Sequence, residues 1–200
     1  MNCEGHNMDN EIKYNAADEK KIEQEVQSAK PRSYLTLIRR VTFAGLFAAL
    51  ILIATQFKIP TGIGYVNLGD GFILVASFLL GPAAFFPAAI GSGLADLLAG
   101  YPIYIPATFV IKGLMGLVAG LLMKNEIIPL PRKIIAFTAA EVIMVAGYFA
   151  YESLPFMYGP AAAAGSVIPN LGQAAVGILI GVLLTQILAK QRNSIRAKLQ

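Results

Sequence analysis

The chain has 200 residues, of which 56% are hydrophobic, and its mean hydropathy is +0.62. The polar residues are too few to coat so much apolar mass in water, so the composition excludes an ordinary soluble domain and indicates an integral membrane protein. The formal net charge of +4 does not indicate nucleic-acid binding, because the basic residues follow the ends of apolar stretches instead of forming one patch.

The first segment of the chain, residues 1–35, is polar and holds seven of the twelve acidic and five of the sixteen basic residues. It lacks the apolar core of a secretory signal, so we expect a cytoplasmic tail that is disordered or loosely helical. The only cysteine and the only histidine, Cys3 and His6, lie in this tail. We therefore expect no disulfide, no metal site and no cofactor in the membrane domain.

Six apolar stretches follow, and each is about long enough to cross a hydrocarbon core of ~30 Å. Turn signals rich in Gly and Pro separate them. The predicted spans are Val41–Phe57, Val66–Leu80, Ala83–Ala99, Ile103–Met123, Lys133–Glu152 and Ser166–Ala189. The sequence thus predicts an all-α bundle of six transmembrane helices over residues 36–190, followed by a basic cytoplasmic tail over residues 191–200.

The distribution of Lys and Arg predicts the orientation of this bundle. Apart from Lys58 and Lys112, every basic residue lies in the N-terminal segment, in the loop Lys124–Lys133 or after Ala189. Positively charged loops stay in the cytoplasm, so both termini and that loop are expected there. The remaining loops are expected to face outward.

Polar side chains from several spans fall at a shared depth. At ~1.5 Å of rise per residue, Asp70, Asp96, Thr108, Tyr148, Asn170 and Gln173 lie about 5–10 Å from the outer end of their spans. Intramembrane polar groups are costly, so we take them, together with Asn67, Tyr101 and Tyr104, as candidate substrate-binding residues. Two structural readings stay open: the tyrosines could form an interfacial belt, and Asp70 could satisfy a helix N-terminus.

Two charges lie deeper, Lys112 at about 14 Å and Glu141 at about 17 Å from the outer ends of their spans. Their matching depth predicts a buried ion pair, because an unpaired buried charge is the costlier state. Asp96 is the competing partner, since a long lysine side chain can climb toward the surface. The pair could hold the structure or take part in gating or ligand binding.

Small residues and missing motifs narrow the function. Ala44/Ala48 and Gly45/Ala49 form two adjacent rows of small residues on the first span, where another helix can approach closely. The sequence contains no P-loop, no H-E-x-x-H and no G-x-S-x-G motif. These observations favour a solute-binding bundle without its own motor and without catalytic activity.

Several short motifs resemble those of the substrate-binding S components of energy-coupling factor (ECF) transporters, in the branch of the riboflavin and hydroxymethylpyrimidine/pyridoxine-type carriers. The resemblance covers about residues 40–190. The motifs are Asn67-Leu68-Gly69-Asp70, Leu80-Gly81-Pro82, the run from Gly91 to Tyr101, Pro106-Ala107-Thr108 and the run from Ile111 to Gly116.

The resemblance implies a multi-pass subunit of a bacterial plasma membrane that captures a vitamin from outside. It also implies two kinds of partner, a transmembrane T component and two ATPases. In that family an A-x-x-x-A stripe on the first helix docks on the T component, and Ala44 and Ala48 match it. The first outer loop acts as a lid during toppling of the subunit, and Lys58–Tyr65 is the matching segment.

The identity of the substrate is open at this stage. The chain has no Trp for stacking a flavin, so a smaller pyrimidine or pyridine vitamin or its precursor is favoured. The main rival is a self-sufficient ion-coupled carrier that uses Asp96, Lys112 and Glu141 as a proton relay. A membrane scaffold without any solute is a third reading.

Overall fold

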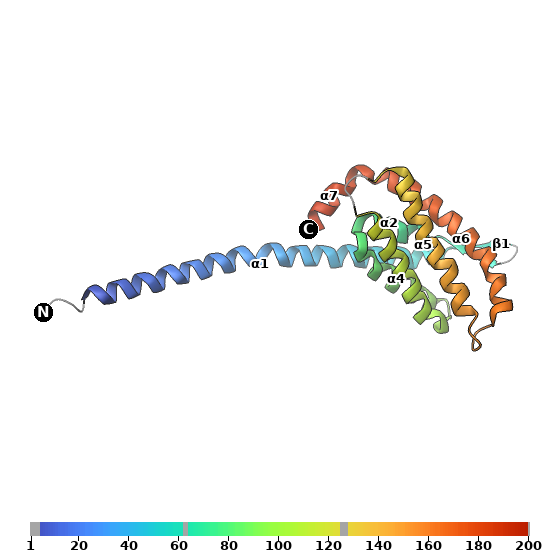
Figure 1. The fold of residues 1–200 in the computed structure, drawn as a ribbon, viewed down its shortest axis with the longest axis horizontal. Helices are drawn as coiled ribbons and strands as arrows, with labels where there is room; N and C mark the ends of the chain where they lie inside the picture. The colour runs from blue at the N-terminus through green and yellow to red at the C-terminus, as the bar shows by residue number, and fades with distance from the viewer. Residues whose placement is uncertain (1–4, 62–63, 125–127, 200) are drawn as a thin grey trace. The chain divides into compact units, whose positions relative to one another are not determined.

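The computed structural model describes residues 5–61, 64–124 and 128–199 (Figure 1). Its contacts divide the chain into two compact units, Met1–Arg40 with Leu199, and Val41–Lys198 with Gln200. Apart from Leu199, the described residues of the first unit belong to helix α1 (Gly5–Gln56), which continues into the second. The predicted N-terminal tail, for which the sequence leaves both disorder and loose helix open, is therefore helical from Gly5 onward. The predicted domain boundaries at residues 35 and 190 stay predictions.

The second unit is a helical bundle with one small hairpin. After α1 come β1 (Lys58–Thr61), β2 (Gly64–Asn67), α2 (Gly69–Leu80), the 3₁₀ helix η1 (Gly81–Ala84), α3 (Phe85–Leu98), the 3₁₀ helix η2 (Pro102–Tyr104), α4 (Ile105–Leu122), α5 (Leu130–Glu152), α6 (Pro160–Ile187) and α7 (Ala189–Leu199). A proline in the first turn begins each of α4, α5 and α6, where its missing N–H costs no helical hydrogen bond.

The hairpin pairs β1 and β2 antiparallel, with Lys58 opposite Asn67. It contains most of the segment that the resemblance designates as a lid, Lys58–Tyr65. Gly62, which belongs to that predicted lid, lies with Ile63 outside the described residues.

The helical class is confirmed, and the described residues contain five stretches long and apolar enough to cross a membrane. These are Tyr34–Gln56, Gly69–Leu98, Pro102–Leu122, Leu130–Glu152 and Pro160–Ile187. The second stretch unites two predicted spans, Val66–Leu80 and Ala83–Ala99, because α2 and α3 are joined by η1 without a polar loop. The count of six crossings therefore stays a prediction.

Helices α2 and α3 nevertheless run in opposite directions. Gly81, with φ of 63°, lies between them. A Cβ atom on Gly120, near the end of α4, would lie only 2.3 Å from the backbone of Gly81. The other end of α3 is near the start of α4, where a Cβ atom on Gly93 would lie 3.7 Å from Ile105. At ~1.5 Å per residue, each of the two helices is shorter than the ~30 Å hydrocarbon core.

Glycines allow α3 and η1 to lie almost against the backbone of α4. A Cβ atom on Gly116 would lie 2.7 Å from the carbonyl oxygen of Ala84, and one on Gly113 would lie 2.6 Å from the ring of Phe85. Such close approach through small residues is typical of helices packed within a membrane. Gly116 and Gly120, four residues apart on α4, thus form a close helix–helix contact within the bundle.

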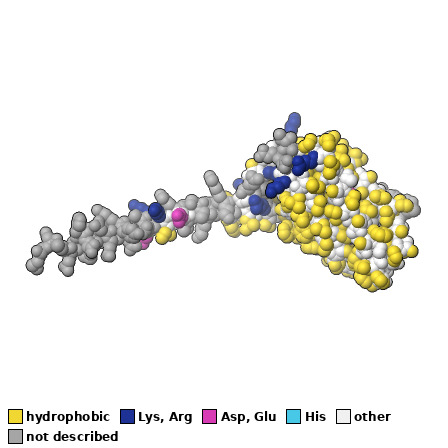
Figure 2. Space-filling model, viewed as in Figure 1, with side chains coloured by type: hydrophobic (Ala, Val, Ile, Leu, Met, Phe, Trp, Pro, Cys, Tyr) yellow, Lys and Arg dark blue, Asp and Glu magenta, His cyan; other side chains and the backbone are white. Residues whose placement is uncertain are grey.

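The interior and the outer surface of the bundle are both apolar. Fully buried side chains of the core include Ile73, Leu74, Met115, Phe137 and Met144. Outward-facing side chains such as Leu98, Val142 and Ile187 are more than half exposed, and Figure 2 shows hydrophobic atoms over most of the visible face of the bundle. A surface of this kind requires lipid rather than water around it, so the chain is a multi-pass membrane protein.

One end of the bundle carries most of its basic residues, and we call it the basic end. It comprises Lys124, Arg132, Lys133, Arg192 and Arg196 at the end of α4, the start of α5 and along α7.

Arg192 is only 2% exposed. Its guanidinium donates to the carbonyl oxygens of Phe78 at 2.9 Å and Met123 at 2.7 Å. Phe78 lies in the last turn of α2 and Met123 directly follows α4, where carbonyls lack a helical partner. Arg192, in the first turn of α7, therefore joins the start of that helix to the C-terminal ends of α2 and α4.

Candidate functional site

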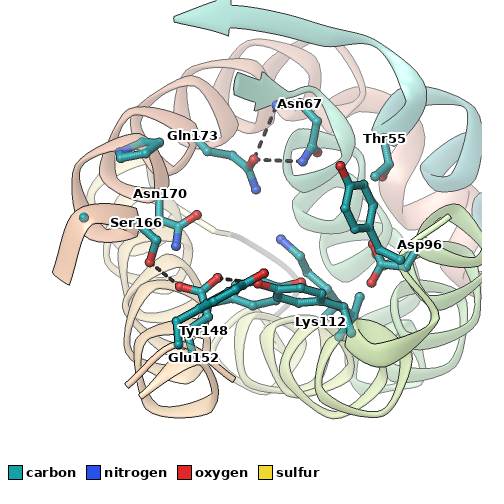
Figure 3. A pocket seen from close by; sticks show the side chains of 16 residues that line it. Thr55, Asn67, Asp96, Lys112, Tyr148, Glu152, Ser166, Asn170 and Gln173 are labelled. Atoms are coloured by element: carbon teal, nitrogen blue, oxygen red, sulfur yellow. Dashed lines mark hydrogen bonds between the residues drawn. The ribbon is translucent and has the colours of Figure 1, made fainter. Parts of the chain in front are cut away.

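At the opposite end of the helices from the basic end, the bundle encloses a pocket of about 430 Å³ (Figure 3). This volume lies within the ~300–1,000 Å³ range of small-molecule sites. The pocket is lined by Thr55, Asn67, Ser92, Asp96, Tyr101, Tyr104, Thr108, Lys112, Tyr148, Glu152, Tyr158, Gly165, Ser166, Pro169, Asn170 and Gln173. Most of these side chains are polar, which is unusual for the interior of a membrane bundle.

A network of four side chains forms the floor of the pocket. The ammonium of Lys112 on α4 contacts Asp70 Oδ1 on α2, and Gln173 Nε2 on α6 donates to Asp70 Oδ2 at 2.6 Å. Gln173 Oε1 accepts hydrogen bonds from Asn67 Nδ2 at 2.8 Å and from the Asn67 backbone N–H at 3.3 Å. Three helices and the hairpin are thereby joined at one point.

The local sequence places Asp70 and Asn67 for this role. Asn67 Oδ1 accepts the N–H of Gly69 at 3.0 Å as the chain enters α2, a typical use of Asn at a helix start. Gly69 is required there, because a Cβ atom at this position would lie 2.1 Å from Thr55 Oγ1. Asp70 then lies in the first turn of α2, where the helix dipole also favours a carboxylate.

Tyrosines and Glu152 form the wall on the α4–α5 side. Tyr104 donates to Glu152 Oε1 at 3.1 Å, and Ser166 on α6 donates to Glu152 Oε2. Thr108 and Tyr148 share a hydrogen bond of 2.9 Å. The ring centroids of Tyr104 and Tyr148 are 6.4 Å apart, within the range of favourable aromatic contacts.

Most of the predicted substrate-binding residues gather in this pocket. Eight of the nine line it: Asn67, Asp96, Tyr101, Tyr104, Thr108, Tyr148, Asn170 and Gln173. The ninth, Asp70, is not among the lining residues but belongs to the network at the floor of the pocket, bonded to Lys112 and Gln173. That any of them binds a substrate stays a prediction.

Sequence reasoning missed several lining residues. Thr55, Ser92 and Ser166 carry small hydroxyl side chains that no depth argument singles out. Glu152 does carry a signal, since it is an acidic residue at the very end of an apolar helix, but the sequence prediction includes it only as the last residue of a span. The count of residues along its span places Lys112 deeper than the predicted substrate-binding residues, yet Lys112 lines the pocket.

The predicted pairing of Lys112 with Glu141 is wrong. Lys112 forms its ion pair with Asp70, and neither carboxylate oxygen of Glu141 has a hydrogen-bond partner among the described residues. Asp96, the competing candidate, is not the partner either. The side chain of Lys112 does extend toward the pocket. Counting residues along each helix gives the depth of a residue, but it does not show which carboxylate a long side chain reaches.

Two further polar atoms lack a hydrogen-bond partner among the described residues, Ser92 Oγ and Asp96 Oδ2. Both belong to α3 and both residues line the pocket. Buried polar atoms are nearly always hydrogen-bonded in folded proteins, so these two atoms are exceptions.

An apolar helical bundle with a polar pocket in one end is the architecture of a membrane-embedded binding protein for small solutes. Residues 36–190 match the model of the family "ECF-type riboflavin transporter, S component". The chain belongs to this family, whose members are substrate-binding subunits of transporters and not enzymes.

Two relatives among known proteins are similar to the chain over most of its length. The chain is 35% identical to an uncharacterized protein of Pyrococcus woesei over 137 residues, which cover 68% of this chain and 90% of the relative. It is 30% identical to the thiamine precursor transporter HmpT of Lactococcus lactis subsp. cremoris over 161 residues, or 76% of this chain and 89% of the relative.

Proposed function

We propose that this chain captures a small water-soluble vitamin or vitamin precursor outside the cell and delivers it through an ATP-driven ECF uptake complex. The observation that carries the proposal is the polar pocket of about 430 Å³ within one end of an otherwise apolar bundle. Its partners are a T component and two ATPase subunits, which supply the motor that the sequence lacks.

The proposed topology has six crossings, with both termini in the cytoplasm of a bacterial plasma membrane. The reversal of direction between α2 and α3 supports six crossings instead of five. Basic residues collect at the end of the bundle away from the pocket, and positive loops stay inside. The pocket then opens toward the outside, and the hairpin β1–β2 lies at its rim as the proposed lid.

Within the pocket, we assign substrate binding to the side chains that face the cavity, and a supporting role to Asp70. Asp70 fixes Lys112 and Gln173 from below. The tyrosines Tyr101, Tyr104 and Tyr148 supply aromatic faces for a heterocyclic ring.

The proposed docking face for the T component lies on α1. Ala44 and Ala48 are half-buried, while Gly45 and Ala49 in the adjacent row are exposed. A Cβ atom on Gly91 of α3 would lie 2.5 Å from the carbonyl oxygen of Ala48, so α3 covers one side of the Ala44/Ala48 row. The open side of the same row, next to Gly45, is where a partner helix would approach.

The decisive experiment measures uptake in cells that express the chain with and without the ATPase and T subunits. Uptake of a vitamin or precursor only in the presence of all partners supports the proposal. Mass spectrometry of small molecules released from the gently purified chain identifies the substrate. Uptake that persists without any ATPase would contradict the proposed complex.

That last result would favour a self-sufficient ion-coupled carrier. The specific observation in its favour is Glu141, a buried carboxyl group with no hydrogen-bond partner among the described residues, near the Lys112–Asp70 pair. A carrier of this kind predicts uptake that depends steeply on pH and is lost in Glu141→Gln, whereas the ATP-driven complex predicts neither.

A further inference from the structure

Three consecutive carbonyl groups at the end of α4, those of residues 122–124, each accept a hydrogen bond from a different arginine. Arg132 in the first turn of α5 donates to the first at 2.9 Å, Arg192 of α7 to the second at 2.7 Å, and Arg196 of α7 to the third at 3.1 Å. Carbonyl groups at a helix C-terminus lack helical partners and attract cations. The end of α4 therefore gathers three guanidinium groups around one turn.

Two cations of the basic end belong to its interior. Arg192 is 2% exposed, and its guanidinium carbon lies 4.8 Å from the ring centroid of Phe78. Lys133 Nζ lies 4.7 Å from the same centroid and donates to the carbonyl oxygen of Thr185 at 3.4 Å. These two side chains pack the helix ends together, so a ligand that approaches from outside does not reach them.

The other three cations lie on the outside, and we call Lys124, Arg132 and Arg196 the outer cations. Lys124 and Arg132 are exposed, and Arg196 is half-buried. A guanidinium group has five N–H donors. The single bond of Arg132 and that of Arg196 leave most of these donors without a partner among the described residues. The outer cations therefore keep hydrogen-bonding capacity for a ligand.

Their charge is also uncompensated within the part of the chain that the structure describes. A carbonyl oxygen accepts a hydrogen bond but carries no formal charge. None of the described carboxylates of the unit Val41–Lys198 belongs to the end of α4, the first turn of α5 or α7; they are Asp70, Asp96, Glu141 and Glu152. Like charges held close together repel each other, so an anion bound among the outer cations would stabilise this end of the bundle.

The surface next to the outer cations is apolar. Ile135, three residues after Arg132 and hence on the same face of α5, is 64% exposed. Leu121, three residues before Lys124, is 51% exposed. Both lie about one turn farther into the bundle than the cation beside them, where exposed apolar side chains require hydrocarbon around them. A ligand that contacts both surfaces therefore combines a negative charge with acyl chains.

We propose that the outer cations bind the phosphate group of one anionic phospholipid, and that its acyl chains pass over Leu121 and Ile135. Arginine forks match phosphate oxygens in bidentate geometry, and basic clusters at membrane helix ends attract anionic headgroups. The end of α4 is ten residues, or ~15 Å, from Lys112 of the pocket. This lipid site is thus separate from the pocket and does not depend on which solute the pocket binds.

Native mass spectrometry of the full chain tests the proposal. The chain is released from micelles that contain equal amounts of phosphatidylglycerol and phosphatidylcholine with identical acyl chains, and the bound lipids are counted. We expect the wild type to retain one phosphatidylglycerol, preferred over phosphatidylcholine at least about tenfold. Arg132→Gln and Arg196→Gln should each lower this preference about fivefold, because each removes one cation from the site.

Lys190→Gln is the matched control. Lys190 is also exposed on α7 but belongs to no described contact with the end of α4, so its removal should leave the preference unchanged. Lys124→Gln breaks no described hydrogen bond and should act like the arginine variants even if these fold poorly. Thermal unfolding is a second readout: phosphatidylglycerol should raise the midpoint of the wild type and of Lys190→Gln above the midpoint in phosphatidylcholine, and raise it less in the other variants.

Three outcomes would overturn the proposal. A wild type that retains both lipids equally has no anionic lipid site. Equal losses of preference in Lys190→Gln and in the variants of the outer cations would show diffuse attraction to a charged surface. Displacement of phosphatidylglycerol by inorganic phosphate at the same concentration would assign the cluster to free phosphate instead of a lipid.

Discussion

The ammonium of Lys112 on α4 contacts the carboxylate of Asp70 on α2, and the two side chains are only 6% and 1% exposed. Asp70 also accepts a hydrogen bond from Gln173 on α6. Burial of two charges costs several kcal/mol of desolvation, which close contact and further hydrogen bonds must offset. The pair therefore stabilises the floor of the pocket only as long as both partners are present.

Replacing one partner of this pair should destabilise the protein strongly. Lys112→Met or Asp70→Leu leaves one buried charge without its counterion and should lower the free energy of unfolding by about 3–5 kcal/mol. The double variant should recover much of this loss, because an apolar pair has no charge to desolvate. Thermal unfolding in detergent measures all three variants, and single effects that simply add would show that the residues are not energetic partners.

Glu141→Leu should leave thermal stability unchanged or raise it. The carboxyl group of Glu141 is buried without a hydrogen-bond partner among the described residues, so its removal deletes a desolvated polar group and breaks no hydrogen bond described in the structure. Unfolding midpoints of Glu141→Leu and Lys112→Met, measured side by side, check this contrast. A loss as large as that of Lys112→Met would restore the pairing of Lys112 with Glu141.

Asn170→Ala should weaken binding of the substrate by about 1–3 kcal/mol, because Asn170 lines the pocket and its amide is proposed to hydrogen-bond the bound molecule. Calorimetric titration of the purified variant gives the affinity. Ser153→Ala serves as the control, since the hydroxyl group of Ser153 donates to the carbonyl oxygen of Phe149 in the preceding helix and Ser153 does not line the pocket. Equal affinities for the two variants would remove Asn170 from the site.

Ala44→Leu combined with Ala48→Leu should abolish uptake but leave substrate binding by the isolated subunit intact. Two bulky side chains one turn apart push away a partner helix that needs close backbone approach. Val142→Leu, an enlargement at an exposed position of α5, is the control and should transport normally. Normal uptake by the double variant would show that the partner docks elsewhere.

Gly120→Val should prevent correct packing of α4 against the turn between α2 and α3. A Cβ atom at this position would lie 2.3 Å from the backbone of Gly81, and backbone atoms cannot move aside as a flexible side chain can. We expect a loss of monodisperse protein in size-exclusion chromatography. Gly45→Ala is the control: no atom lies within 4 Å of its Cβ position, so it should fold at least as well as the wild type. A Gly120→Val variant that remains monodisperse would contradict the close contact between Gly120 and Gly81.

The sequence alone determined the class of this protein and the layer in which its pocket lies. Hydropathy is a property of consecutive residues, so the apolar stretches can be read along the chain without knowledge of their packing. The cost of polar groups in a membrane likewise makes residues such as Asp96, Thr108 and Asn170 stand out at a common depth. Eight of the nine residues chosen on this basis line one pocket.

Only the tertiary structure decided which side chains meet. Depth along a helix does not give the rotation of that helix about its axis, its tilt or the reach of a long side chain. For this reason the sequence predicted Glu141 as the partner of Lys112, whereas packing of α2 against α4 brings Asp70 to it. The same packing leaves Asp96 Oδ2 unpartnered among the described residues, because hydrogen bonding depends on neighbours that come together only in the folded bundle.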